Sequence, residues 1–495
     1  MFSHYYKFEK KIHYIYNIID SLQVNFFLAM QKEEEESLMK KKNIIFILML
    51  VVSAMLCACN VDKNDKINTT EATESVVEES TEAIVQEEKT DDDIQTDVVV
   101  DESKDHKQMT LDMIALLEED AELKSMMEKS IAKAAEINPD KNTNPAQNLE
   151  EFYDFLDWAN TCQPWNVLKN AKYPTLYEHI DQSVDYFWFL VDQPLEELED
   201  KGYYYPTLQY HEPIASWCKK YANAWGDFLD TEDSWSDEYY DYICSDDRFA
   251  MKSGLYAMEN EWNTFNEWFS RKLADPEASR PIDNAEVVAP ADSKPQGVWE
   301  VDENGNFKQH EGVVLKSKNF NSIPEIIGED SEYENDFAGG TLTHTFLDVN
   351  DYHRYHFPVS GTIKEVRKID ATNAAGGITT WNDETGKYVL EDAIPGWQSV
   401  ETRDCLIVDT KDYGLVAILP IGMSQICSCN WEDTVVVGAE VKKGDPMGYF
   451  LFGGSDIVMI FQDCVEFEML AEPDGSDGYN HINMGQAYGK LVKKN

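Results

Sequence analysis

Side chains that could carry nucleophilic or acid–base chemistry gather in the C-terminal half of the chain. His353 and His356 stand three residues apart in a polar and aromatic segment, where such a pair can hold a metal, exchange protons or simply lie on the surface. Asp292 is a lone carboxylate after Ala-Pro, a setting typical of a turn or cap residue. Ser455 follows two glycines, a pattern that by itself indicates a tight turn. Taken one at a time, these residues leave the chemistry open.

Four segments contain or precede these residues, and the order of the segments along the chain indicates which chemistry the residues carry out. They are FNEWFSRKL at 265–273, VAPAD at 288–292, DYHRYHFPVSG at 351–361 and GDPMGYFLFGGS at 444–455. Together they resemble phosphatidylserine decarboxylases, which carry an FNEFF-like segment, a P-x-D segment, a YHRxHxP loop and a G-x-F-x-x-G-S turn in this order. The resemblance covers roughly residues 261–470, close to half of the chain. One departure is Asp456, which stands where the family turn usually has threonine.

The resemblance implies a proenzyme that cuts itself between Gly454 and Ser455. Serine is a weak nucleophile unless a base takes its proton. The resemblance gives that role to His356, with Asp292 fixing its tautomer as in other Ser-His-Asp arrangements. Attack of Ser455 on the Gly454 carbonyl, followed by β-elimination and hydrolysis, would leave a covalent pyruvoyl group at the head of a short chain, 455–495.

The implied pyruvoyl group, made from Ser455, would be the electron sink of a decarboxylase, comparable in role to pyridoxal phosphate. His353 resembles the family residue that returns a proton to the substrate carbon, a task suited to a group with a pKa near neutrality. The resemblance implies no external cofactor and no metal.

Two substrates follow from the resemblance. The first is phosphatidylserine, converted to phosphatidylethanolamine and CO2. The second is a soluble aromatic amino acid such as tryptophan, because NAWGDFL at 223–229, with Ser234 soon after, is similar to the leader domain of pyruvoyl-type tryptophan decarboxylases. A function of another class is a non-catalytic exported binding module on the same fold, and the intact set of chemical residues argues against it. A plain serine hydrolase is disfavoured because no G-x-S-x-G elbow accompanies the serine.

Two regions of different character must position these residues. From Met109 to about Leu273 apolar residues recur at helical spacing, which predicts helices at 149–158, 176–190, 213–229 and 255–273. After Pro281 short apolar runs alternate with turn residues, which predicts strands at 286–289, 361–369, 405–408, 415–421, 434–437 and 457–461. The expected class is α+β, with an N-terminal α-helical leader domain (108–260) followed by a β-rich, sandwich- or barrel-like catalytic domain (261–495).

The N-terminal residues resemble an export signal. Three lysines precede an apolar run at 44–56, which is too short to span a bilayer comfortably and is typical of a signal-peptide core. The run ends in Leu-Cys-Ala-Cys, which resembles the bacterial lipobox and implies cleavage before Cys59 and lipidation of its thiol. An ordinary signal peptide or a short anchor helix is the alternative. We expect a wrongly assigned start at 1–38 and a lipoprotein signal peptide at 39–59.

The charge of the chain bears on its partners. Residues 60–107 are acidic and lack aromatics, so we expect a disordered tether there. The formal net charge of −51 repels nucleic acid, which excludes a nucleic-acid partner, and it also repels anionic lipid headgroups. The expected location is the extracytoplasmic face of the cell membrane, held there by the lipid anchor at Cys59.

Overall fold

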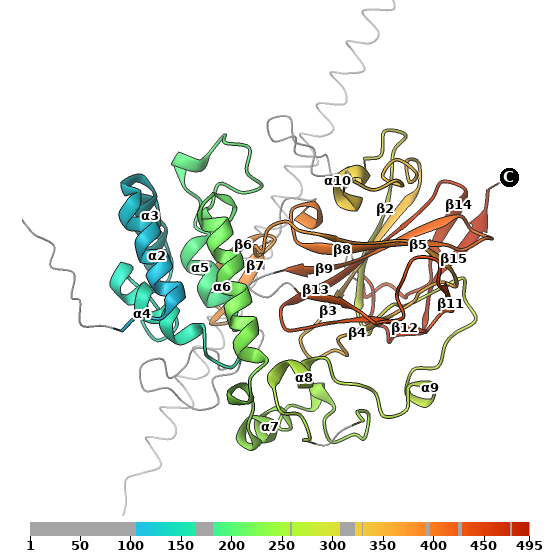
Figure 1. Ribbon diagram of the computed structural model, residues 1–495, viewed down its shortest axis with the longest axis horizontal. Coiled ribbons are helices and arrows are strands. Elements are labelled where there is room, and N and C mark those ends of the chain that lie inside the picture. Colours follow the sequence, from blue (N-terminus) through green and yellow to red (C-terminus); the bar gives the residue numbers. More distant parts are fainter. Residues whose placement is uncertain are drawn as a thin grey trace, which may run out of the picture. The chain divides into compact units, whose positions relative to one another are not determined.

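Helices fill the first part of the described chain and strands fill the second (Figure 1). The computed structural model describes residues 105–164, 182–257, 260–306, 322–328, 330–391, 397–423, 428–475 and 478–494. The expected wrong start, the signal peptide with Cys59 and the tether up to residue 104 lie outside these ranges. None of the helices in the described ranges combines the length and the apolar stretch that crossing a membrane requires.

The order of elements confirms the α+β class. The helices are α2 (Gln108–Glu119), α3 (Ala121–Ile137), α4 (Leu149–Ala159), α5 (Asp185–Val191), α6 (Ile214–Leu229), α7 (Asp237–Ile243), α8 (Phe265–Phe269), α9 (Pro276–Ser279) and α10 (Ile323–Ile327). The strands are β1 (Val287–Val288), β2 (Lys294–Glu300), β3 (Thr341–Leu347), β4 (Arg354–His356), β5 (Gly361–Ile369), β6 (Ile378–Asn382), β7 (Lys387–Glu391), β8 (Arg403–Asp409), β9 (Leu415–Met423), β10 (Cys429–Trp431), β11 (Glu440–Val441), β12 (Pro446–Phe450), β13 (Gly454–Phe461), β14 (Val465–Met469) and β15 (Ala487–Lys493).

Helix α6 connects two hydrophobic cores because its apolar stripe runs along its whole length. Trp217 and Tyr221, in its first half, pack in a core made by α2 to α5. Trp225 and Leu229, further along the same face, pack in a second core with α8 and the sheets. The spacing of four residues keeps these four side chains on one stripe. One helix therefore ties the helical region to the part of the chain that carries Ser455.

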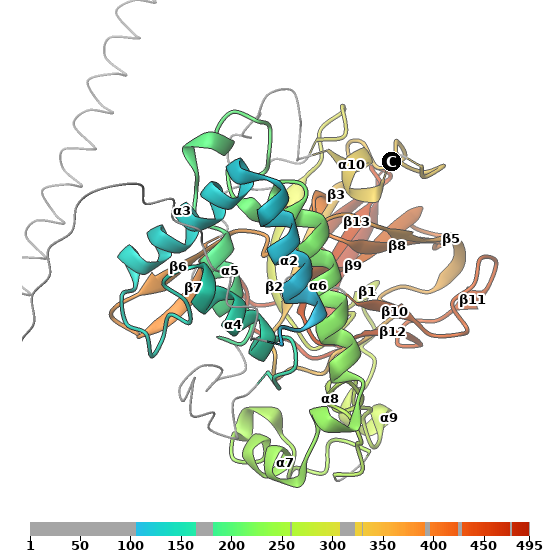
Figure 2. The ribbon, with the colours of Figure 1, turned by 60° about the vertical axis from the view of Figure 1, so that its left-hand side comes forward.

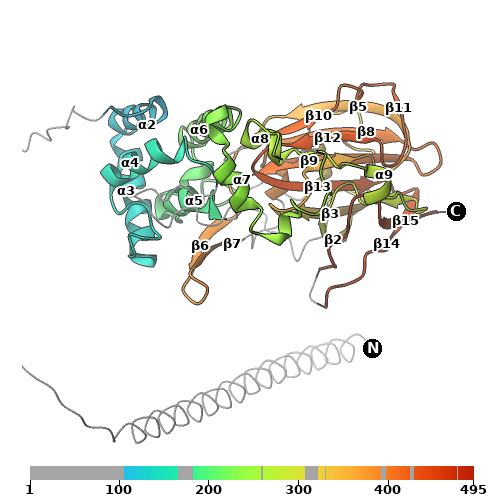
Figure 3. The same cartoon turned by 90° about the horizontal axis from the view of Figure 1, so that it is seen from below.

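A seven-stranded antiparallel sheet, in the order β11-β5-β8-β9-β13-β3-β2, forms the centre of the β-rich region. Strand β13 lies between β9 and β3, so it is hydrogen-bonded along both edges. Alternation along a strand sends Ser455 and Ile457 to one face and Asp456 and Val458 to the other. Ile457 and Val458 indeed belong to different cores. Figure 3 shows α8 beside the end of the sheet at which β13 begins.

A hairpin of the β-rich region, β6–β7, lies against α5 of the helical region (Figure 2). Tyr388 of β7 is buried in the helical core, where its hydroxyl donates to the Thr143 carbonyl at 3.0 Å and accepts from Asn138 at 3.1 Å. Gln182 bonds both the N–H and the C=O of Tyr388, as a neighbouring strand would. A side chain of the β-rich region is therefore part of the hydrophobic core of the helical region.

Two sequence predictions of local structure are wrong. The stretch 255–273 is helical only at Phe265–Phe269, and its two ends meet in an antiparallel bridge between Tyr256 and Leu273, so the chain doubles back as a loop. The stretch 434–437 forms turns rather than a strand, and Val436 and Val437 are 56% and 63% exposed. In the first place apolar residues pack from a loop, and in the second two valines lie exposed in turns; their spacing alone reveals neither.

Replacing Tyr388 by Ala should lower the free energy of unfolding by about 3–5 kcal/mol, the usual cost of removing a buried aromatic ring. Chemical denaturation of the full chain measures this. Val389→Ala, on the exposed side of the same strand, is the matched control and should cost less than about 1 kcal/mol. Equal effects of the two substitutions would show that the helical region does not depend on this hairpin.

Candidate active site

Ser455 lies at the start of the central strand, fully enclosed. Its side chain is 1% exposed, and its neighbours across the sheet are Leu347 of β3 and Gly422 of β9. Just before it, Gly453 has φ 147°, a backbone conformation that side-chain-bearing residues rarely adopt. The chain therefore enters β13 through a bend that needs glycine at 453, and Gly454 then joins the ladder opposite Met423.

His353 is the titratable side chain that meets Ser455 within the described part of the chain. Ser455 Oγ lies 3.2 Å from His353 Nδ1, and the other ring nitrogen, Nε2, lies 3.1 Å from the Asp348 carbonyl oxygen. A carbonyl can only accept, so Nε2 carries the hydrogen and Nδ1 of the neutral ring carries a lone pair. The backbone at Asp348 thus fixes the tautomer in which His353 can accept the Ser455 proton.

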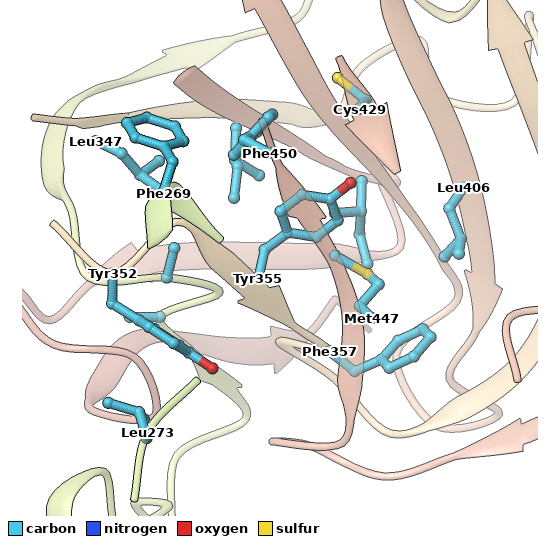
Figure 4. Close-up of a cluster of buried hydrophobic side chains, with 14 of the residues drawn as sticks. Phe269, Leu273, Leu347, Tyr352, Tyr355, Phe357, Leu406, Cys429, Met447 and Phe450 are labelled. Carbon is cyan, nitrogen blue, oxygen red and sulfur yellow. The ribbon is translucent and has the colours of Figure 1, made fainter. Parts of the chain in front are cut away.

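The surroundings of His353 keep the ring neutral. Its ring stacks on Phe269 of α8 with 3.9 Å between centroids, and Phe269 and Leu347 belong to the buried cluster drawn in Figure 4. Burial, together with the Arg271 cation, lowers the pKa of His353 to about 3. A neutral imidazole is available as a proton acceptor over the whole physiological range.

His356 does not contact Ser455 in this structure, contrary to the expected role. Its Nδ1 donates to the Gly444 carbonyl at 2.9 Å, and its Nε2 lies 3.2 Å from the Tyr352 hydroxyl. Both ring nitrogens are therefore occupied, and burial lowers the pKa of the ring. His356 could serve Ser455 only by giving up one of these partners.

Asp292 does not orient His356 either, because other donors occupy its carboxylate. Arg280 Nε donates to Oδ1 at 2.8 Å and Arg280 Nη2 to Oδ2 at 2.5 Å. The backbone N–H of Met484 also donates to Oδ1, at 2.8 Å. The predicted Asp292–His356 hydrogen bond is thus replaced by a buried ion pair that also holds a C-terminal segment.

Sequence reasoning assigned no role to several residues that support this site. Arg280 was visible directly after the FNEWFSRKL segment, but nothing in the sequence paired it with Asp292. Asn266 accepts from the Phe452 N–H at 3.3 Å and donates to Asp230 at 2.9 Å, so it connects the end of α6 with the turn before Ser455. Trp225 of α6 also contacts Phe452, with 5.6 Å between ring centroids.

Asp456 points away from the Ser455 face and pairs with a second histidine. His344 of β3 lies 2.7 Å from Asp456 Oδ1, and both side chains are buried. At the position where the family turn usually has threonine, this chain therefore has Asp456, hydrogen-bonded to the buried His344. Within the described residues, no three His, Cys, Asp or Glu side chains are grouped closely enough to hold a metal ion.

The comparisons with known proteins assign the region that holds these residues to a family. The phosphatidylserine decarboxylase family model matches residues 265–490, which include Asp292, both histidines and Ser455. The proenzyme of this name from Ruminiclostridium cellulolyticum is 30% identical over 243 residues, which cover 47% of this chain and 72% of the relative. The chain belongs to the phosphatidylserine decarboxylase family.

Other relatives of this family member carry different names. An L-tryptophan decarboxylase of Psilocybe cyanescens is 26% identical over 275 residues, which cover 49% of this chain and 60% of the relative. A decarboxylase of Amanita muscaria is 27% identical over 280 residues, which cover 50% of this chain and 77% of the relative. Since each of these relatives is named as a decarboxylase, this phosphatidylserine decarboxylase family member is an enzyme of the carboxy-lyase class.

Replacing Asp292 by Ala should lower the free energy of unfolding by about 3–5 kcal/mol, because it leaves the Arg280 cation without its buried partner. Hydrogen exchange should also show faster exchange at Met484. Asp283→Ala is the matched control, since this exposed carboxylate likewise accepts a C-terminal backbone N–H, from Ala487, and should cost about 1 kcal/mol. If Asp292→Ala lowers the free energy of unfolding by no more than the control does, the ion pair is not needed for stability, and Asp292 would act only in the chemistry of the site.

Proposed function

We propose that this chain is a proenzyme that cuts itself between Gly454 and Ser455 and becomes a pyruvoyl-dependent decarboxylase. The observation that carries the proposal is the contact between Ser455 Oγ and the lone pair of His353 Nδ1, directly after the backbone bend at Gly453. Membership of the family adds the reaction class. The products would be a long chain ending at Gly454 and a short chain, 455–495.

The chain's own groups suit each step of the cut. Ser455 Oγ gives its proton to an imidazole and bonds to the Gly454 carbonyl carbon, while the peptide C–N bond breaks and its nitrogen takes up a proton. Elimination then moves the Ser455 Cα proton to a base and breaks the bond between Cβ and Oγ, which frees the Gly454 carboxylate and leaves a double bond between Cα and Cβ. A proton added at Cβ turns this enamine into an imine. Water finally replaces the nitrogen, which leaves as ammonia, and a ketone remains at position 455. No external oxidant or reductant is needed.

The site fits the pyruvoyl group that this sequence of steps would leave. The group would occupy the space of Ser455, enclosed by Leu347 and His353. When present it would supply an electron sink for loss of CO2 from an amine substrate. His353 Nδ1 lies next to the reacting atoms, so during turnover it would take up a proton and pass it to the substrate carbon, as its predicted role requires.

The short chain would stay in place after the cut. Strand β13 is bonded to β3 and β9, and β15 near the C-terminus pairs with β1 of the long chain. Ile482 exchanges two backbone hydrogen bonds with Ser293, at 2.9 Å each. These contacts hold both ends of the 455–495 segment to the long chain.

We propose phosphatidylserine as the first substrate, because the matching family model and the bacterial relative bear its name. A lipid anchor at Cys59 would keep the enzyme near this lipid, on the extracytoplasmic face of the cell membrane. An aromatic amino acid such as tryptophan is the second candidate. It is favoured by the Psilocybe relative and by Trp225, through which the helical region contacts the turn before Ser455. The charge of −51 favours a soluble substrate over an anionic bilayer.

Intact mass of the purified protein and of Ser455→Ala tests the cut. We expect a fragment with the mass of residues 455–495 and a pyruvoyl-sized blocked N-terminus from the parent chain, and a single uncut chain from the variant. The reason is that the methyl side chain of the variant offers no oxygen to attack the Gly454 carbonyl. An uncut parent chain would overturn the proposal and favour the non-catalytic binding module.

His353→Ala should lower decarboxylation by about 10²–10⁴-fold, because it removes the acid–base group next to Ser455. Release of CO2 from phosphatidylserine vesicles and from L-tryptophan, measured in parallel, checks this and identifies the substrate. His356→Ala is the companion variant, scored both for the cut and for turnover. If His353→Ala still cuts itself and His356→Ala does not, His356 is the base for the cut. If turnover in His353→Ala is unchanged, His353 has no catalytic role in decarboxylation.

A further inference from the structure

Arg271 is a buried cation beside the site, and its contacts within the described chain include no carboxylate. Its side chain is 1% exposed and its guanidinium lies over the rings of Tyr256 and Trp268, 4.5 and 4.9 Å from their centroids. Burying a charge without a counter-ion is costly, even when aromatic faces offset part of the cost. The cation is bound by neutral acceptors, which include the Tyr256 hydroxyl at 3.2 Å and the Phe269 carbonyl at 3.4 Å.

The guanidinium is directed at the backbone of the turn that precedes His353. Arg271 Nη2 lies 3.1 Å from the Asn350 carbonyl oxygen and 2.9 Å from that of Asp351. The same turn is closed by two short bonds, from the Asp348 N–H to the Asp351 carboxylate and from the Asp351 N–H to the Asp348 carbonyl, at 2.8 Å each. Arg271 therefore holds the two carbonyls of this turn that point toward α8.

This turn supplies the carbonyl that sets the His353 tautomer. The Asp348 oxygen accepts from His353 Nε2, so any movement of the turn would release the ring nitrogen opposite the one that meets Ser455. The Arg271 charge also acts on the ring directly, since it contributes to the lowered pKa of His353. The Asp351 carboxylate, which could oppose this effect, is already paired with His481 at 2.8 Å.

We propose that Arg271 is a positioning residue of the active site: its guanidinium clamps the Asp348–Asp351 turn and so holds His353 as a neutral ring with Nδ1 free to accept a proton. This role gains catalytic meaning from the proposed function of His353. The positioning itself exists in the uncut chain and can be measured there.

The test is NMR titration of histidine ring signals in the full chain carrying Ser455→Ala, which stays uncut whether or not the parent cuts itself. Loss of one signal in His353→Gln assigns the ring. With Arg271 present, His353 should stay neutral between about pH 5 and 8, with the hydrogen on Nε2. In Arg271→Met the single tautomer should be lost and the midpoint should move up, although burial, the larger cause of the lowered pKa, remains. Lys272→Met removes the neighbouring exposed charge and should leave the His353 signals unchanged.

Arg271→Lys covers the case in which Arg271→Met does not fold. Lysine keeps the charge but lacks the planar guanidinium whose Nη2 bonds both carbonyls, so His353 should stay neutral while both tautomers are populated. A purely structural role of Arg271 predicts lower thermal stability with unchanged His353 signals. Parent-like His353 signals in either folded variant would overturn the proposal.

Discussion

The position of Ser455 on the central strand of an antiparallel sheet is the constraint on which the rest of the site depends. A nucleophile that attacks its own backbone needs a bent peptide, yet a central strand needs regular hydrogen bonds on both edges. The chain meets both demands by placing the bend one residue earlier, at Gly453, and beginning the ladder at Gly454. A bond between 454 and 455 can then break while every following residue of β13 stays paired with β3 and β9.

Burial is the second feature, and it makes the histidine pair chemically unequal. Both rings are removed from water, which disfavours their charged forms and leaves their hydrogen-bond partners to decide their roles. One ring nitrogen of His353 donates to a backbone carbonyl and the other faces Ser455. Both ring nitrogens of His356 are hydrogen-bonded, to the Gly444 carbonyl and the Tyr352 hydroxyl. The two rings thus differ through backbone oxygens and a hydroxyl, and no carboxylate bonds either ring within the described structure.

The sequence could predict which residues gather at the site but not how they pair. The four segments do surround Ser455, and the α+β order follows from the change of periodicity near Pro281. The partners of Asp292 could not be foreseen, because nothing in the local sequence pairs it with Arg280, and the Met484 N–H reaches it only through the folding back of the C-terminal segment. The local error at 434–437 has a simple cause, because the valines at 436–437 have the pattern of a strand, yet Gly438, with φ 90°, ends the run in turns.

The helical region bears on substrate choice because it reaches the site through packed contacts. Helix α6 places Trp225 against Phe452, three residues before Ser455, and Asp230 at its end bonds Asn266, which in turn bonds the Phe452 N–H. On the Phe452 side, the cover over position 455 is therefore anchored in the helical region. A decarboxylase domain alone would lack this cover, so the helical region is the part of the chain in which a difference in substrate from other family members would be built.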